Sequence, residues 1–331
     1  MPAIRKVVVC GAGFLGRHIA KAVISSPKSI GDSDVQVQVS SRRPRKVWES
    51  LVAEEKLSTH SLLPPVPIDI TDPATLDPAL QHAEVVISLV GIMHGSPQDF
   101  EIVQLKGAEN VARAAKTAGA KLIHFSAIGA DPSSNIPYVR TKGLAEQSIF
   151  AISPDAIIIR PSLVFGPEDD FFNRFARLSK ILPFLPVFGG GTSLFQPVYV
   201  GDIARFVSHL SCNVGRINTT ASWDFSGKVI EAGGPEVFSY KQLMQIILEA
   251  TGRRRPIISL PFFMGMIQGA VLEKLPVNLF TVTRAQVTQL KNDNIVSCPM
   301  PPNHVSLEDA LSRFSSAPLH AVREIVPTYI D

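Results

Sequence analysis

Three glycines near the N-terminus constrain the fold of this chain more than any other feature of its 331 residues. Gly11, Gly13 and Gly16 form a G-x-G-x-x-G pattern. The pattern directly follows the apolar run at residues 7–10 and opens an amphipathic stretch at residues 14–25. A strand, a tight glycine turn and a helix in this order predict the start of a β-α-β unit, in which the strand and the helix pack closely.

The alternation of strand and helix continues through the first half of the chain. Strand-like runs occupy residues 7–10, 35–39, 66–70, 85–90, 121–126 and 156–159. Helical periodicity occupies residues 14–25, 100–118 and 138–150. This order predicts an α/β protein with a Rossmann-like, doubly wound parallel sheet. The strict Val-Gln alternation at 35–39 predicts a strand with one wetter face.

The pattern changes after Arg160, where prolines and glycines cluster. Ser239 is a predicted cap for a helix at 240–251, and residues 283–292 are periodic. We therefore expect a Rossmann domain at 1–170, with returning strands near 196–204 and 228–235, and a smaller, mostly helical lobe from 171–195 and 236–331. The polar stretch 211–227 is expected to be a surface loop.

In its strand-turn-helix context the glycine pattern predicts a site for a dinucleotide pyrophosphate. The free N–H groups and the positive dipole end of a helix N-terminus attract phosphate. Gly11, Gly13, Phe14, Leu15 and Gly16 are the predicted contacts.

The end of the second strand favours NADP(H). An NAD site usually has an acidic residue there to bind the ribose 2′-hydroxyl. This chain has Ser41, Arg42 and Arg43 instead, and an arginine fork can pair with a 2′-phosphate. NAD(H), with two solvated surface arginines, is the alternative.

Other strand ends supply further predicted cofactor contacts. Asp69 and Ile70 end the third strand and are expected near the adenine, unless Asp69 only caps the next turn. Val90 and Gly91 follow the fourth strand, and Pro161 follows the sixth. A glycine at position 91 permits close approach to the cofactor.

Ser126, Tyr138 and Lys142 form a candidate catalytic trio. Tyr138 and Lys142 are four residues apart on a predicted helix and share one face, while Ser126 ends the preceding strand. In a carbonyl reductase, Tyr donates a proton, Lys lowers the Tyr pKa and binds the nicotinamide ribose, and Ser positions the carbonyl oxygen. The alternative is that Lys142 only holds the ribose while Tyr138 only packs. His124, inside a strand, is expected to be a core residue, and no metal-binding spacing is visible.

Charge and cysteine content exclude other classes. Lys plus Arg is 32 and Asp plus Glu is 29, so the formal charge of +3 does not imply nucleic acid as a partner. The three cysteines are far apart and suit a reducing compartment. No apolar run has the length of a membrane helix, and no cleavable presequence is visible before the first strand.

Further motifs resemble one family of short-chain dehydrogenases. The run at 11–17 resembles the opening of extended and atypical members, and Arg-Pro-Ser-Leu-Val-Phe-Gly-Pro at 160–167 resembles their signature after the sixth strand. The segments 168–175, 195–202 and 283–296 are similar to the nucleotide-binding accessory subunit of respiratory complex I, alpha subcomplex subunit nine, and its relatives. The resemblance covers residues 5–330, although Cys10 replaces the first glycine of the common G-x-x-G-x-x-G form.

This resemblance implies tight NADPH binding by the residues named above. It also implies a non-turning-over structural role on the matrix side of the mitochondrial inner membrane, with complex I or quinone-biosynthesis proteins as partners. A cytoplasmic location is the alternative because no presequence is visible.

Three functions follow from these features. The first is a cofactor-carrying accessory protein. The second is an active NADPH-dependent reductase or dehydrogenase for a lipid-like or quinone-like carbonyl. The third, ranked last, is a nucleotide-sugar epimerase.

The apolar stretch 256–279 is interpreted as the core of the small lobe, or as a surface for an isoprenoid, a hydrophobic partner or a membrane interface.

Overall fold

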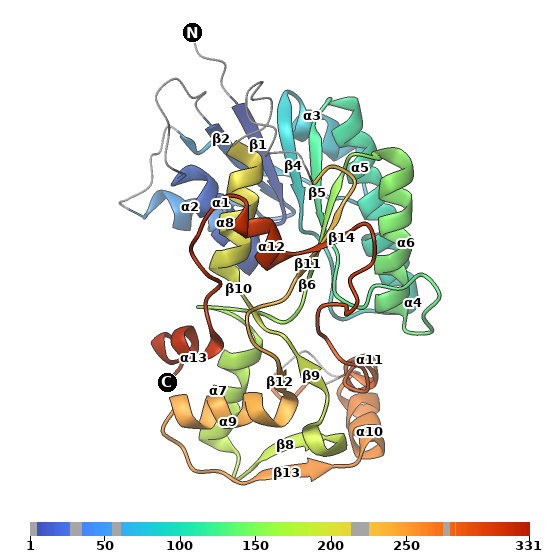
Figure 1. The fold of residues 1–331 in the computed structure, drawn as a ribbon. Coiled ribbons are helices and arrows are strands. Elements are labelled where there is room, and N and C mark those ends of the chain that lie inside the picture. Colours follow the sequence, from blue (N-terminus) through green and yellow to red (C-terminus); the bar gives the residue numbers. More distant parts are fainter. Residues whose placement is uncertain (1–4, 27–34, 55–60, 213–224, 274–278, 282) are drawn as a thin grey trace. The chain divides into compact units, whose positions relative to one another are not determined.

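The computed structural model describes residues 5–26, 35–54, 61–212, 225–273, 279–281 and 283–331. The chain divides into two compact units, each described by itself (Figure 1). The first contains Met1–Arg160, Val200–Glu231 and Pro299–Ala317. The second contains Pro161–Tyr199, Ala232–Cys298 and Pro318–Asp331. Residues 299–317 thus return to the first unit, whereas the sequence pattern assigned them to the C-terminal lobe.

An eight-stranded sheet forms the centre of the first unit. Its order is β14-β11-β6-β5-β4-β1-β2-β3, and the strand pairs from β3 to β6 run parallel. The strands are β1 (Arg5–Cys10), β2 (Val35–Ser41), β3 (Val66–Pro67), β4 (Ala83–Ser88), β5 (Lys121–Phe125), β6 (Ile157–Pro161), β11 (Val229–Ala232) and β14 (His304–Ser306). The order 3-2-1-4-5-6 within this sheet is that of the Rossmann fold, so the predicted fold class is confirmed.

Helices cover both faces of this sheet (Figure 1). Helix α1 packs against α8, and α5 packs against α3 and α6. Their bounds are α1 (Phe14–Ile24), α2 (Arg45–Val52), α3 (Leu76–Leu80), α4 (Pro97–Phe100), α5 (Gly107–Thr117), α6 (Pro137–Ile152), α8 (Val200–Cys212) and α12 (Leu307–Ser312).

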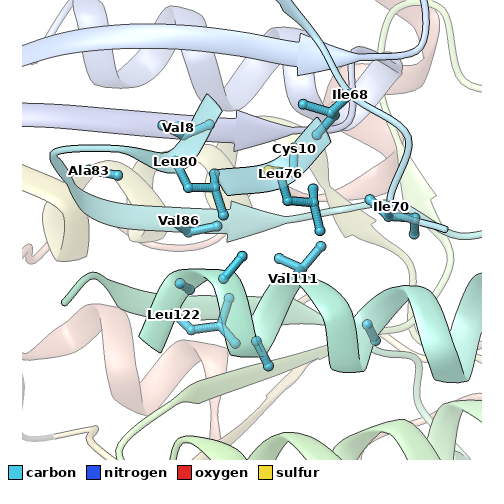
Figure 2. Packing of buried hydrophobic residues seen from close by; sticks show 14 of the residues in the cluster. Val8, Cys10, Ile68, Ile70, Leu76, Leu80, Ala83, Val86, Val111 and Leu122 are labelled. Carbon is cyan, nitrogen blue, oxygen red and sulfur yellow. The ribbon is translucent and has the colours of Figure 1, made fainter. Parts of the chain in front are cut away.

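The core between the sheet and α3 and α5 contains small and branched apolar side chains (Figure 2). Val8 and Cys10 from β1, Val86 from β4, Leu76 from α3 and Val111 from α5 belong to this cluster, and each is fully buried. Burial raises the pKa of the Cys10 thiol to about 12. Cys10 therefore fills the core beneath the glycine turn as a neutral, unreactive thiol.

The prediction that one face of β2 is exposed to solvent is wrong at Gln38. Gln38 is only 4% exposed, and its side-chain amide donates to the Ser40 hydroxyl at 2.9 Å and to the Ala79 carbonyl at 3.1 Å. Because helices cover the sheet on both faces, Gln38 is buried and paired instead of solvated.

Several other elements differ in extent from their predicted ranges. β3 ends at Pro67 instead of residue 70, and β4 ends at Ser88. The predicted helix at 100–118 contains a π-helical segment, Glu101–Lys106, between α4 and α5. Of the expected loop at 211–227, residues 213–224 lie outside the described part of the chain.

The second unit combines helices with two-stranded sheets. Its helices are α7 (Phe171–Ile181), α9 (Tyr240–Ala250), α10 (Phe262–Leu272), α11 (Arg284–Gln289) and α13 (Val322–Ile325). The small sheets pair β7 (Val164–Phe165) with β10 (Val198–Tyr199), β9 (Leu194–Phe195) with β12 (Phe238–Ser239), and β8 (Leu185–Phe188) with β13 (Ile257–Leu260). The predicted strand near residues 196–204 therefore does not rejoin the main sheet, whereas the one near 228–235 does so as β11.

Two helix starts of the second unit are fixed by reciprocal side-chain bonds. Ser239 and Gln242 form a capping box at α9, as Thr283 and Gln286 do at α11. Each box satisfies backbone donors that the first turn leaves unpaired. In the described residues no helix is long and apolar enough to span a bilayer.

Candidate dinucleotide site

The glycine turn between β1 and α1 is held by backbone contacts. Gly11 has a φ of +134°, and its N–H donates to the Ser40 carbonyl of β2 at 2.8 Å. A Cβ on Gly16 would lie 1.8 Å from the Gly11 carbonyl oxygen, whereas one on Gly13 would meet no atom of the described residues within 4 Å. Gly11 and Gly16 are thus required by the fold itself, while the exposed Gly13 leaves open space above the turn.

That space lies at the N-terminus of α1. Gly13 is the N-cap residue and provides no side-chain cap, so the first-turn N–H groups beside Phe14 and Leu15 keep their capacity to bind an anion. Both side chains are partly buried, which leaves backbone groups as the contacts toward a ligand. This arrangement fits a pyrophosphate.

Two exposed arginines follow the carboxyl end of β2. The Ser41 hydroxyl accepts a hydrogen bond from the Arg43 N–H at 3.2 Å, and Arg42 and Arg43 are both exposed. Since β1 and β2 are adjacent and parallel, the arginines lie at the same sheet edge as the glycine turn.

Asp69 and Ile70 are engaged within the protein. The Asp69 carboxylate accepts hydrogen bonds from the Thr71 N–H and hydroxyl at 2.9 and 2.7 Å. Those bonds, and then the charge of Arg42, lower its pKa. Ile70 is in the core, and its carbonyl accepts from the Asn110 amide at 2.9 Å. The geometry matches the turn-capping alternative for Asp69, and contact of either residue with a cofactor stays a prediction.

The segment after β4 connects the turn to the candidate catalytic trio. The Leu89 N–H donates to the Cys10 carbonyl at 2.9 Å, which keeps this segment at the end of β1. A Cβ on Gly91 would lie 3.4 Å from the Lys142 ammonium nitrogen. Val90 is partly buried and Gly91 is exposed, while Pro161 is the last residue of β6. Contacts of these three with a cofactor stay predictions.

Lys142 lies on α6, and its buried ammonium group reaches the carboxyl end of β5. Its side chain is 6% exposed and donates to the Phe125 carbonyl at 2.9 Å. Burial lowers its pKa to about 8, and the charge of Glu146 acts in the opposite direction. Glu146 is itself held by Arg160 through two hydrogen bonds of 2.9 and 2.6 Å.

Ser126 and Tyr138 complete the trio with different environments. Ser126 directly follows the residue whose carbonyl binds Lys142, and it is 5% exposed. Within the described residues its hydroxyl has no hydrogen-bond partner. Tyr138 lies one turn before Lys142 on α6 and packs edge-on against Phe100, with ring centroids 6.0 Å apart. Burial raises its pKa to about 12.

Gln104 belongs to the same region, and the sequence pattern did not reveal it. It lies in the π-helical segment and is 2% exposed; its amide donates to the Thr141 hydroxyl at 3.2 Å. Its carbonyl oxygen has no partner among the described residues and would lie 3.5 Å from a Cβ on Gly91. A π-bulge often marks a functional site, but periodicity does not predict one.

His124 is a core residue, as expected, but only one of its two ring nitrogens has a hydrogen-bond partner among the described residues. It is 1% exposed, and its Nδ1 lies 3.2 Å from the Ser88 hydroxyl. In the described chain Nε2 has no partner. Burial, and then the charge of Lys142, lower the His124 pKa to about 3, so the imidazole is neutral.

Three buried polar atoms without a hydrogen-bond partner indicate whether this region suits a polar ligand. The Gln104 carbonyl oxygen, the Ser126 hydroxyl and His124 Nε2 each lack a partner where a buried polar group without one costs about 1–3 kcal/mol. A ribose hydroxyl or a substrate oxygen would satisfy such groups beside Lys142. The residues fit a dinucleotide that extends from the glycine turn past Gly91. Among the described residues no group of His, Cys, Asp and Glu could hold a metal ion.

The sheet order and the glycine turn define a Rossmann-type nucleotide-binding protein. The chain belongs to the NAD dependent epimerase/dehydratase family, whose model matches residues 7–219.

Curated relatives agree with the resemblance seen in the sequence. The mitochondrial NADH dehydrogenase [ubiquinone] 1 alpha subcomplex subunit 9 of Arabidopsis thaliana is 29% identical over 295 residues, 86% of this chain and 69% of that protein. The same subunit of Mus musculus is 32% identical over 70% of this chain and 60% of its own length. A ceramide reductase of Caulobacter vibrioides is 31% identical over 60% of this chain and 58% of its own length.

Solved structures confirm the fold. The Citrobacter sp. triphenylmethane reductase complexed with NADP(H) has a TM-score of 0.69 at 18% identity, covering 98% of this chain and 97% of that one. MoeE5 in complex with UDP-glucose and NAD has a TM-score of 0.67 at 18% identity, with the same coverage.

The different surroundings of two glycines predict separable effects. Gly16→Ala should lower the free energy of unfolding by about 3 kcal/mol, because its methyl group overlaps the Gly11 carbonyl. Gly13→Ala should lower it by less than about 1 kcal/mol, yet weaken dinucleotide binding at least about tenfold by filling the space above the turn. Urea unfolding and fluorescence titration measure the two quantities. Equal effects of both substitutions on stability would contradict this assignment.

His124 should make the protein sensitive to acid. Its folded pKa of about 3 lies below the unfolded value of about 6.5. The unfolded state therefore binds the extra proton between these values, and stability falls as the pH falls below about 6.5, by up to about 1.4 kcal/mol per pH unit. His124→Gln should flatten this part of the stability profile, measured by urea unfolding at several pH values. The exposed His82 serves as control, since His82→Asn should leave the profile unchanged.

Proposed function

We propose that this protein binds NADP(H) tightly and acts as a cofactor-carrying accessory factor of the complex I subunit 9 type. The observation that carries the proposal is the pair of exposed guanidinium groups, Arg42 and Arg43, at the sheet edge that holds the glycine turn. A 2′-phosphate on the adenine ribose would meet positive charge at a position where an NAD site has a carboxylate.

The state of Tyr138 supports carriage of the cofactor over rapid turnover. A general acid works best when its pKa is near the operating pH. Burial moves the Tyr138 pKa away from neutrality, to about 12, and the Lys142 ammonium donates to the Phe125 carbonyl. The hydroxyl is therefore a weak proton donor in this structure.

The curated relatives support a cellular location and a partner complex for the proposed accessory role. The curated subunits of Arabidopsis thaliana and Mus musculus are mitochondrial and named as parts of NADH dehydrogenase. We extend this to the chain as a mitochondrial location and an association with respiratory complex I, and the matrix side remains part of the proposal.

The arginine pair should set the nucleotide preference. The wild type should bind NADPH at least about tenfold more tightly than NADH, because charge-assisted hydrogen bonds contribute about 1.5–3 kcal/mol. Arg42→Ala combined with Arg43→Ala should remove this preference and leave NADH affinity within about twofold. Calorimetric titration of both nucleotides measures it.

The control is Arg45→Ala. This nearby exposed arginine pairs with Glu49 at 3.0 Å and should not affect the preference. Equal affinities of the wild type for NADPH and NADH would mean that the site accepts either cofactor. If the protein binds neither nucleotide, the proposed function is refuted.

An active reductase is the second candidate, favoured by the unpaired hydroxyl of Ser126. A bound nicotinamide would supply a hydride to a carbonyl carbon. Ser126 would donate a hydrogen bond to the carbonyl oxygen, Tyr138 would donate the proton, and Lys142 would hold the ribose. The ceramide reductase relative supports a lipid-like carbonyl as the substrate class.

Replacement of the Tyr138 hydroxyl tests this second function. Any carbonyl-dependent oxidation of NADPH by the wild type should fall at least about 100-fold in Tyr138→Phe, since general acid catalysis contributes about that factor. NADPH affinity should stay within about twofold because the ring still packs against Phe100. Tyr240→Phe, a buried tyrosine of the second unit, is the control. Turnover that survives in Tyr138→Phe would exclude Tyr138 as the proton donor.

A further inference from the structure

Helix α10 approaches its neighbours closely at two glycines, Gly265 and Gly269. A Cβ on Gly265 would lie 2.8 Å from the Phe188 ring and 3.0 Å from Val287, and one on Gly269 would lie 2.7 Å from the Arg284 backbone nitrogen. Both glycines are buried, and their spacing of four residues places them on one face. This face approaches α11 so closely that no larger side chain fits.

The opposite face of α10 presents large apolar side chains to solvent. Phe263 is 63% exposed, Met264 44% and Ile267 62%. Their positions, i, i+1 and i+4, group them on one side of the helix. An amphipathic surface helix normally exposes polar side chains, whereas α10 carries apolar residues on its exposed face as well as on its packed face.

A basic groove of ≈ 690 Å³ lies at the other end of β13 from α10. Its charged lining residues are Lys241, Arg253, Arg254, Arg255 and Glu249. Four cations and one carboxylate give the groove a positive character.

The single carboxylate of the groove is already paired. Glu249 forms an ion pair with Arg323 at 2.7 Å. Arg255 donates to the neutral Ser179 carbonyl at 3.3 Å and forms no ion pair with another described residue, and Arg254 is exposed.

Strand β13 joins the groove to the apolar face over a short distance. Its four residues span about 13 Å, and Ile258, 40% exposed, lies between the two features. Exposed apolar side chains bordered by cations form the pattern of a surface that binds at the boundary of headgroups and acyl chains.

We propose that the apolar face of α10 and the basic groove together form a docking surface for an anionic lipid bilayer. Phe263, Met264 and Ile267 enter the boundary of the acyl chains, while Arg254 and Arg255 meet the headgroup phosphates. The apolar residues project outward from a helix, as insertion into lipid requires. This inference is independent of nucleotide binding.

Vesicle sedimentation of the full chain tests the proposal. Vesicles of one-third phosphatidylserine and two-thirds phosphatidylcholine should bind the protein at least about tenfold more tightly than pure phosphatidylcholine, and added salt should weaken the binding. Failure to bind the anionic vesicles would overturn the proposal and leave the face to a protein partner. Equal binding to both compositions would also overturn it.

Substitutions on each part of the surface locate the contact. Phe263→Ser with Ile267→Ser should weaken binding at least about tenfold, because each exposed side chain would lose its burial in lipid. Arg254→Glu should weaken it at least about fivefold. The matched controls in the first unit, Val52→Ser and Arg113→Glu, also change exposed side chains and should have no effect.

Measurements of folding and nucleotide binding distinguish a specific loss of lipid binding from a loss caused by misfolding. All four variant proteins should keep the thermal unfolding midpoint and the NADPH affinity of the wild type, since the replaced side chains are exposed. Unchanged lipid binding in the double variant, or an equal loss in either control, would refute the docking surface.

Discussion

The contact between Gly16 and the Gly11 carbonyl sets the distance between β1 and α1, and the rest of the site depends on that distance. No side chain fits between them, since a Cβ would lie 1.8 Å from the oxygen. The same turn is tied to β2 through the Ser40 carbonyl and to the segment after β4 through the Cys10 carbonyl. Three strand ends are thereby fixed around one backbone turn, and Gly91 is placed beside Lys142.

The sequence predicted those parts of the protein that local chemistry determines. The glycine spacing and the alternation of strand and helix indicated the Rossmann sheet, whose order the structure confirms. Ser239 indicated the start of α9 because a hydroxyl at this position bonds to the third residue of the helix. Lys142 was found because its spacing from Tyr138 repeats a helical turn, although its bond to the Phe125 carbonyl depends on β5 and α6 meeting in space.

Long-range packing explains what the sequence did not predict. Gln38 follows an alternating pattern typical of a half-solvated strand, but its pairing with Ala79 depends on the cover provided by α3. Gln104 faces the site only because six residues of a long helix adopt π geometry, which has no periodic signature. β10 has two residues, too few for a pattern to reveal its pairing with β7.

The tight cofactor retention and the slow turnover that we propose for this protein can share one physical cause. The hydroxyl of Ser126 and the carbonyl oxygen of Gln104 are buried without partners in the described chain, so the free protein carries their desolvation cost. A ligand that satisfies them recovers this free energy on binding and loses it on release, which strengthens the ground state. Interactions that stabilise bound ligand and transition state equally do not accelerate a reaction. In the proposed carrier function, the Tyr138 pKa of about 12, raised by burial, would add slow proton transfer to tight binding.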